Sequence, residues 1–373
     1  MRIVHLIQSA PRIYGAERCA LLELRALRQR GLDAQALVLH ETRMGAAAGT
    51  LEQALREAGV PVTRVESTSP ISARLMLQLL RAMWRLQPHL LHSHGLKTDV
   101  LGFLASRLLR LPLLVEVHGW LRPEEDRRVR FYEALDRQVL RRCEAALVLS
   151  REYQSELSRL GVRRLHLLPS GIDVDGLRAQ PVHCDLRRQL AIPQEARVAG
   201  MVARLSPEKG HRDFLFALAE ARRRLPSLWG LLVGDGPLQE TLRAEAERLG
   251  LDGYVRFVGY QDNVADVYRA LDVVVSCSRY EGLPLCLIEA MALERPVVAM
   301  ATGGCTDIVQ PGETGVLVPR GDRIALAEAL AELAADPERC RRLGQAGLAR
   351  VQQHFSIAAW ARGAESLYRS LLA

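Results

Sequence analysis

The chain has 373 residues, of which 49% are apolar, 25% charged and 5% aromatic, and its net charge is +7. The length predicts two domains, and the composition excludes a disordered chain. No run approaches the roughly 18 to 20 apolar residues of a membrane span, so we expect a cytoplasmic protein without a secretory leader. The positive excess arises within residues 1–175 and fits either an acidic partner, such as anionic lipid, a phosphorylated acceptor or nucleic acid, or a solvated basic face.

Short apolar runs alternate with longer amphipathic segments along the first half, which is typical of parallel strands covered on both faces by helices. In chain order we expect strands at 3–7, 36–39, 89–94 and 111–119, and helices at 16–30, at 71–86 and up to 110. The second half repeats this rhythm with the runs VAGMVA, LWGLLVG, VRFVG, DVVVS and RPVVAM, each followed by a helical segment, and the chain is helical after residue 336. The pattern predicts two doubly wound α/β domains.

The segment 166–184 is dense in Pro, Gly and Asp and is predicted to be a hinge. We therefore expect an N-terminal domain over 1–172, a C-terminal domain over 173–355 and a last helix over 356–373. Ligands of open α/β sheets bind outside the carboxyl ends of the strands, so the residues after each apolar run are the candidates for a site.

The run VAGMVA is followed by Arg-Leu-Ser-Pro-Glu-Lys-Gly, residues 204–210. We expect Ser206 to cap a helix that begins at Pro207, with Arg204 and Lys209 beside its positive end. Because helix N-termini bind phosphate, two cations at this place favour a diphosphate site over routine surface charge. Only Lys97 and Lys209 are lysines among the 50 basic residues, which indicates that a compact ammonium is needed in this loop.

Two carboxylates flank the apolar run after DVVVS. Glu281 lies in the predicted strand-end loop, just before a helix that starts near Pro284, and Glu289 lies about one turn inside that helix. A partly buried carboxylate needs hydrogen-bond donors, and a ribose diol supplies two; a helix glutamate paired with Arg295 is the alternative. Gly282 allows backbone amides to approach a ligand.

The first half offers fewer signals. Gly15 follows the first apolar run, so its backbone can approach a phosphate, but G-x-G-x-x-G is absent there, which argues against a nicotinamide dehydrogenase. His118 ends the run LLVEV, where a histidine is by itself more often structural than catalytic. His92 and His94 suggest a metal, but no carboxylate or Cys is spaced to complete a shell, so we expect a core or acceptor contact.

No metal is expected elsewhere either. The seven cysteines are scattered without a C-x-x-C pair, so neither disulfides nor zinc are indicated. Asp173 and Asp175 form an Asp-x-Asp pattern, which can hold a metal-bound diphosphate, but they fall in the predicted hinge.

The segment 74–86 carries a polar stripe made of Arg74, Gln78, Arg81 and Arg85. Such a basic amphipathic helix can lie on an anionic membrane. It can equally be a helix of the domain, which its place within the strand-helix rhythm favours.

Six segments, in this order, resemble the motifs of retaining glycosyltransferases of the family 4 type, which have the GT-B fold: IYGAER (13–18), PSGID (169–173), ARLSPEKG (203–210), LLVGDGP (231–237), EGLPLCLIEAMA (281–292) and GGCTDIVQPGETGVLVP (303–319). The fourth contains the Gly-x-Gly turn, and the fifth contains the Glu-x7-Glu signature. Three positions depart from the family pattern: Tyr14 and Glu294 stand where glycine is usual, and Asp307 stands where glutamate is usual. The fold implied is α/β, with a C-terminal helix returning to the N-terminal domain.

The resemblance also implies roles for residues of this chain. The residues that would hold the donor diphosphate are Gly15, Arg204, Lys209, Gly282, Leu283 and Leu285. Glu289 would bind the ribose, backbone around Tyr260 and Val264 would bind the base, and the catalytic residues His118 and Glu281 would bind the transferred sugar. The residues that would contact the acceptor are Tyr14, His94, Lys97 and Trp120. The implied enzyme moves a hexose from a UDP-, GDP- or ADP-sugar to a glycan or lipid-linked glycan in polysaccharide or lipopolysaccharide synthesis, with retention and without metal or other cofactor. It would be cytoplasmic or peripheral on the inner membrane face, with no nucleic-acid partner; the alternative is a nucleotide-sugar epimerase of the same architecture.

Overall fold

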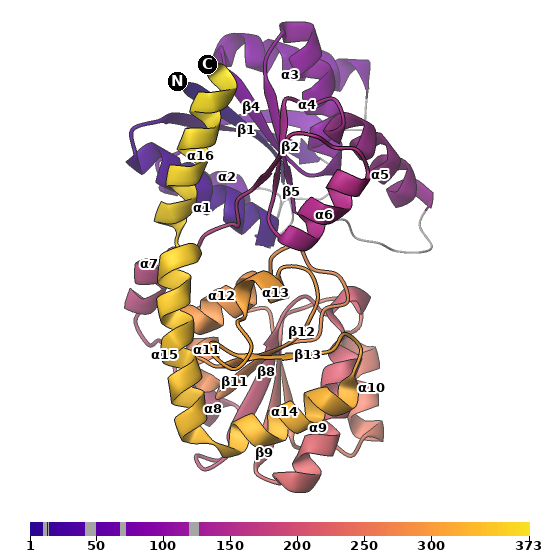
Figure 1. The fold of residues 1–373 in the computed structure, drawn as a ribbon, viewed down its shortest axis with the longest axis vertical. Coiled ribbons are helices and arrows are strands. Elements are labelled where there is room, and N and C mark those ends of the chain that lie inside the picture. The colour runs from indigo at the N-terminus through magenta and orange to yellow at the C-terminus, as the bar shows by residue number, and fades with distance from the viewer. Residues whose placement is uncertain (10–12, 14, 42–49, 68–71, 119–126) are drawn as a thin grey trace. The chain divides into compact units, whose positions relative to one another are not determined.

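The computed structural model describes residues 1–9, 13, 15–41, 50–67, 72–118 and 127–373. Contacts between Cα atoms divide the chain into two compact units. Unit 1 comprises Met1–Ile172 together with Ile357–Ala373, and unit 2 comprises Asp173–Ser356, so the division falls within the segment 166–184 (Figure 1).

Unit 1 is a seven-stranded parallel sheet in the order β3-β2-β1-β4-β5-β6-β7. Its strands are β1 Arg2–Gln8, β2 Asp33–Glu41, β3 Val62–Ser67, β4 Leu90–His94, β5 Leu113–Val117, β6 Ala145–Val148 and β7 Leu165–Leu167. The helices are α1 Gly15–Gln29, α2 Thr50–Glu57, α3 Ala73–Leu86, α4 Leu96–Leu109, α5 Arg127–Leu140, α6 Arg151–Arg159 and α16 Ile357–Leu372. The alternation of strands and helices that the sequence predicts is confirmed.

The two faces of this sheet have different chemistry because successive side chains of a strand point to opposite faces. One face carries Val4 and Leu6 of β1 with Leu91 of β4, and the apolar sides of α3, α4, α5 and α6 cover it. The other carries Ile3, His5 and Ile7, and α1 and α16 lie side by side in the same unit (Figure 1). The last helix therefore belongs to the N-terminal domain, as expected.

Unit 2 is a six-stranded parallel sheet in the order β10-β9-β8-β11-β12-β13. Its strands are β8 Arg197–Val202, β9 Leu228–Val233, β10 Val255–Gly259, β11 Val273–Ser276, β12 Val297–Met300 and β13 Val316–Val318. The helices are α7 Val174–Ala179, α8 Leu186–Gln189, the 3-10 turn η2 Pro207–Lys209, α9 His211–Arg224, α10 Gln239–Arg248, α11 Val264–Ala270, α12 Leu285–Ala292, α13 Cys305–Ile308, α14 Arg323–Ala335 and α15 Pro337–His354. Two parallel, helix-covered sheets confirm the predicted fold class.

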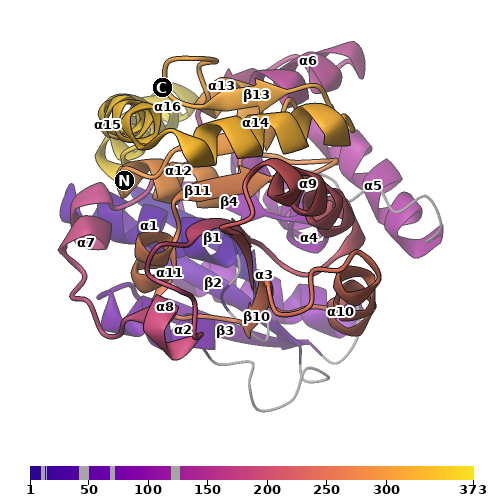
Figure 2. The same cartoon turned by 90° about the horizontal axis from the view of Figure 1, so that it is seen from below.

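The core of unit 2 forms where α9 and α14 pack side by side against the sheet (Figure 2). Phe214, Leu218 and Leu330 are fully buried there.

The backbone at Glu294 explains why glycine would suit this position. The φ of Glu294 is +58°, which lies in the left-handed region. No helix in the described ranges is both long and apolar enough to cross a bilayer.

Candidate functional site

The carboxyl edge of the unit 2 sheet brings together two residues that the sequence singles out. Lys209 Nζ donates to Glu281 Oε2 at 2.7 Å, although 72 residues separate them. The two side chains are 24% and 12% exposed, respectively. Burial lowers the pKa of Lys209, but the Glu281 carboxylate more than offsets this effect, so the pKa lies above its usual value. A cation is therefore held at this edge at neutral pH.

The local structure around Lys209 differs from the expected capped helix. Pro207 does occupy a first helical position, but the element is the single 3-10 turn η2, and the Ser206 hydroxyl makes no capping bond. That hydroxyl instead donates to the Glu208 carboxylate. The helix α9 begins at His211, after Gly210 has taken a left-handed conformation with φ +71°. The expected cap is wrong because the backbone forms a 3-10 turn here, in which the amide of Lys209 donates to the carbonyl oxygen of Ser206 and not to its hydroxyl.

Glycine at two positions lets the strand-end loops approach closely enough to place these residues. A Cβ on Gly303, whose φ is +51°, would lie 1.8 Å from the carbonyl oxygen of Glu281. A Cβ on Gly210 would lie 2.1 Å from the carbonyl oxygen of Cys277. Only glycine fits both the conformation and the space, so the loops that hold Glu281 and Lys209 are fixed by backbone contacts.

Glu289 lies inside α12 and is 4% exposed. Its Oε2 accepts a hydrogen bond from the hydroxyl of Tyr268 at 2.7 Å. Arg295, the alternative partner, donates instead to the carbonyl oxygen of Leu271. The sequence analysis missed Tyr268, which is fully buried in the short helix α11. A buried hydroxyl needs a partner, but only the folded structure shows that this tyrosine is buried.

The other predicted donor residues lie on the same strand-end segments. Gly282 and Leu283 are buried, and Leu285 is the first residue of α12, whose N-terminus has no side-chain cap. Arg204 is exposed, and no ion pair of its guanidinium occurs within the ranges that the structure describes. Tyr260 is half-buried after β10, and Val264 begins α11. The carbonyl oxygen of Gly259 already accepts from the amide of Gly234 at 2.8 Å.

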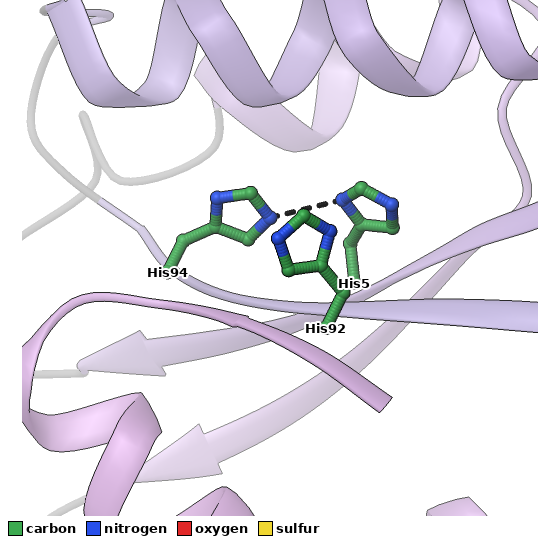
Figure 3. A group of neighbouring side chains, drawn as sticks. All are labelled: His5, His92 and His94. Carbon is green, nitrogen blue, oxygen red and sulfur yellow. Dashed lines mark hydrogen bonds between the residues drawn. The ribbon is translucent and has the colours of Figure 1, made fainter. Parts of the chain in front are cut away.

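In unit 1 a cluster of buried histidines lies beside Glu116, on the face of the sheet that carries His5. The strand register pairs His5 with His92 and His94 with Glu116. Figure 3 shows His5, His92 and His94 with their rings together and the bond from His5 Nδ1 to His94 Nε2, which is 2.9 Å long. Glu116 Oε2 lies 3.2 Å from His92 Nε2 and 3.6 Å from His94 Nδ1.

The expectation that no carboxylate accompanies these histidines is therefore wrong. Glu116 lies on the neighbouring strand, so spacing along the chain does not reveal it, whereas the register does. The signal that could have found the cluster is the pair of patterns H-x-H and E-x-H at the ends of adjacent parallel strands. His118, half-buried just after β5, contacts His94 Nδ1 through its Nε2 at 3.2 Å.

The charges of this cluster are set by burial and by one another. Burial lowers the pKa values of His5 and His94 well below their usual range, and His92 lowers both further. Burial would raise the pKa of Glu116, but His118, His92 and His94 offset it and bring the pKa to about 2. Glu116 is thus a carboxylate, and burial keeps the rings of His5 and His94 neutral at neutral pH.

The remaining predicted residues have mixed positions. Gly15 is the exposed first residue of α1, and nothing lies within 4 Å of where its Cβ would be. Lys97 is buried in the first turn of α4, 9% exposed. Tyr14 and Trp120 lie outside the described residues. Asp173 caps α7 by accepting from the amide of Gly176 at 2.9 Å, which is a structural role.

Among the residues that the structure describes, two groups of side chains come close enough to share a metal ion: His5, His92 and His94, and His94, Glu116 and His118, each with ligand atoms within 4.8 Å of one another. The nitrogens of the first group already face partners within the network, including Tyr368 at 2.9 Å from His92. The expectation of no metal stays a prediction.

Comparison with known proteins gives a consistent family. Residues 14–171 match the glycosyl transferase 4-like domain, and residues 184–350 match the glycosyl transferases group 1. A 2-deoxystreptamine N-acetyl-D-glucosaminyltransferase of Streptomyces fradiae is 34% identical over 281 residues, which is 70% of this chain and 66% of that protein. A D-inositol 3-phosphate glycosyltransferase of Corynebacterium efficiens is 33% identical over 309 residues, 75% of this chain and 70% of that protein.

The fold is similar to that of Anabaena Alr3699/HepE, solved in complex with UDP-glucose. The TM-score is 0.86 at 24% identity, and the match covers 99% of this chain and 100% of that one. The resemblance inferred from the motifs is confirmed: the chain belongs to the family 4 glycosyltransferases and has the GT-B fold.

Proposed function

We propose that this protein is a retaining, metal-independent glycosyltransferase that moves a hexose from a nucleotide diphosphate sugar to a hydroxyl of a glycan or lipid-linked glycan. The observation that carries the proposal is the pair of Lys209 and Glu281, 2.7 Å apart at the carboxyl edge of the unit 2 sheet. A cation for a diphosphate and a carboxylate for sugar hydroxyls lie side by side, where α/β sheets bind their ligands.

The chemistry follows from the charges. Lys209 and the exposed Arg204 would stabilise the negative charge that develops on the departing diphosphate, which is the task that a metal has in other enzymes. Uncapped amides at the start of α12 would add to this stabilisation. Glu281 and His118 would bind hydroxyls of the sugar as it gains oxocarbenium character, and Glu289, held by Tyr268, would bind the ribose.

The bond changes balance without a covalent enzyme intermediate. The bond from the anomeric carbon to the donor phosphate oxygen breaks, and the acceptor oxygen bonds to the same face of the sugar. The acceptor proton moves to the departing phosphate oxygen. This course retains the anomeric configuration and asks the protein to position and to stabilise charge.

The acceptor is a polyhydroxylated molecule in the proposal. Two relatives are named for 2-deoxystreptamine and for D-inositol 3-phosphate, which are small cyclitols. An acceptor panel therefore includes cyclitols beside lipid-linked glycans.

The basic helix α3 supports a membrane-bound acceptor. Its buried side packs on the core of unit 1 through Leu75 and Leu79, so the favoured interpretation as a domain helix is sound. Its opposite side exposes Trp84 by 69% and Leu77 by 47%, together with Arg81. An amphipathic indole beside guanidinium groups suits the interface of an anionic bilayer, and we propose that α3 contacts the inner membrane surface.

The test is donor turnover in EDTA with UDP-, GDP- and ADP-sugars, with and without the acceptor panel, followed by NMR of the anomeric proton of the product. The proposal expects nucleoside diphosphate only when acceptor is present, and an unchanged anomeric configuration. Nucleoside diphosphate or an isomerised sugar formed without acceptor would favour the epimerase alternative. Turnover that begins only when Mg²⁺ or Mn²⁺ is added would contradict the assignment of Arg204 and Lys209.

A further inference from the structure

The histidine cluster of unit 1 is a continuous chain of polar contacts that ends at His118. His92 Nδ1 lies 2.9 Å from the hydroxyl of Tyr368, and that hydroxyl lies 3.4 Å from His5 Nε2. His5 Nδ1 lies 2.9 Å from His94 Nε2, and His94 Nδ1 lies 3.2 Å from His118 Nε2. Each contact requires one proton, and a neutral imidazole supplies one donor and one acceptor.

With one proton on each ring, the intact chain has only two arrangements, because every link must have a donor on one side and an acceptor on the other. In the first, His92 carries its proton on Nε2, and the direction of donation leaves His118 protonated on Nε2. In the second, every proton sits at the other end of its link, and His118 Nε2 is unprotonated. Tyr368 supports either arrangement because its hydroxyl donates to one histidine and accepts from the other.

Glu116 decides between them. Its carboxylate oxygens lie 3.2 Å from His92 Nε2, 3.6 Å from His94 Nδ1 and 3.7 Å from His118 Nε2. In the first arrangement two of these three nitrogens carry a proton, including His92 Nε2 at the shortest distance, and the third has a lone pair. In the second arrangement two of the three have a lone pair and only one carries a proton. A carboxylate attracts N–H dipoles and repels lone pairs, so the first arrangement is favoured.

We infer that Glu116, through the chain that includes Tyr368 of the C-terminal helix, fixes His118 with its proton on Nε2 and leaves Nδ1 free to accept a hydrogen bond from a substrate hydroxyl. Glu116 and Tyr368 are positioning residues, since they act through His118. The consequence for catalysis rests on the proposed function; the tautomer does not.

The groups around the chain agree with this assignment. Glu23 of α1 faces the same cluster, and burial, aided by Glu116, raises its pKa well above its usual value. Burial, with Glu23 and Glu116, likewise raises the pKa of Tyr368, so its hydroxyl keeps its proton. Cys19 has a raised pKa through burial and Glu23. Among the described neighbours, Glu116 therefore supplies the anion that orients the chain.

The experiment is two-bond ¹H–¹⁵N NMR on protein labelled with ¹⁵N-histidine, which distinguishes a protonated from an unprotonated ring nitrogen. His118→Gln identifies the signals of His118. In the wild type we expect Nε2 of His118 to be protonated and Nδ1 to be unprotonated above the pH at which the ring loses its charge. Wild-type protein with the proton on Nδ1 would overturn the inference.

Two variants test the mechanism. Glu116→Gln removes the charge while keeping the shape, and Tyr368→Phe removes the hydroxyl that joins the two arms of the chain. Each is expected to give a mixture of His118 tautomers and to lower kcat by roughly 10- to 100-fold with a smaller change in KM. The matched control is Glu52→Gln, because Glu52 lies 3.4 Å from buried His40 in the same unit but outside the chain.

The outcomes separate the inference from the proposed function. A fixed tautomer in both variants would overturn the roles of Glu116 and Tyr368, and stoichiometric Zn²⁺ in the purified protein would replace the proton chain by a metal site. If one variant fails to fold, as its melting curve would show, the other carries the test. The expected tautomers combined with full transfer activity in His118→Gln would leave the inference standing and contradict the proposed role of His118.

Discussion

The ion pair of Lys209 and Glu281 predicts that a carboxylate of the site opposes nucleotide binding. A phosphate oxygen bound to Lys209 at about 2.8 Å would lie at most about 5.5 Å from the Glu281 oxygen that now accepts from the same ammonium. The repulsion between unit charges at that distance is roughly 3 kcal/mol at an effective dielectric of about 20 and roughly 0.8 kcal/mol in water. Glu281→Gln should therefore tighten the binding of nucleoside diphosphate by about 4- to 150-fold.

The measurement is calorimetric titration of UDP, GDP or ADP, whichever binds the wild type most tightly. A nucleoside diphosphate lacks the sugar, so the proposed favourable contact of Glu281 with sugar hydroxyls does not enter. Lys209→Met should weaken binding, and the double variant should lose most of the gain from Glu281→Gln, because the repulsion acts on a phosphate held by Lys209. Glu328→Gln, an exposed charge on α14, is the control for net charge. Unchanged or weaker binding by Glu281→Gln would refute this reasoning.

Three further predictions concern single features. Gly303→Ala would place a Cβ 1.8 Å from the Glu281 carbonyl oxygen, so this variant should abolish sugar transfer and lower the melting temperature. Gly312→Ala is the control and should lower the melting temperature less, because the φ of Gly312 is also positive, at +78°, but its Cβ would meet nothing within 4 Å. Equal losses in the two variants would contradict the steric argument. The pKa of Lys209 lies above its usual value, so the ammonium loses its charge only as the pH rises through that raised pKa. The nucleotide affinity of the wild type relative to that of Lys209→Arg, measured by calorimetry, should therefore stay constant up to about pH 10. A relative affinity that falls at a lower pH would count against the pairing of Lys209 with Glu281. Trp84→Ala should reduce co-sedimentation with vesicles rich in phosphatidylglycerol but not change the melting temperature by more than about 1 °C, since the side chain is 69% exposed; equal binding to neutral vesicles would argue against a charge-dependent contact.

The sequence predicted the fold class well because continuous apolar runs identify buried parallel strands. It did not predict β3, β6, β7 or β13, which are short or alternate polar with apolar residues. The strand β3 shows the reason, because its sequence VTRVES belongs to the edge of the sheet, where one side chain in two faces solvent. Prediction of the Ser206 cap failed because the segment forms a 3-10 turn, in which the Lys209 amide donates to the Ser206 carbonyl oxygen, and residue type alone does not distinguish this turn from the start of an α-helix.

In the candidate site, the residues that follow strands could be named from the sequence, but their partners could not. Lys209 and Glu281 were chosen separately, on charge and on position. Their contact depends on the order of β8 and β11 in the sheet, which only the folded chain sets. The same holds for Tyr268 beside Glu289, since they lie on different helices.

By itself, the sequence determined the two parallel α/β units, the family, and the strand-end residues that offer cations and carboxylates, because periodicity, composition and motif spacing are local properties of a chain. The tertiary structure alone decided that Glu116 accompanies His92 and His94, and that Tyr368 of the last helix reaches them. Parallel strand register and the docking of a helix from the far end of the chain bring these groups together. Such contacts depend on which strands become neighbours and on where the last helix docks, and the spacing of residues along the chain does not determine either.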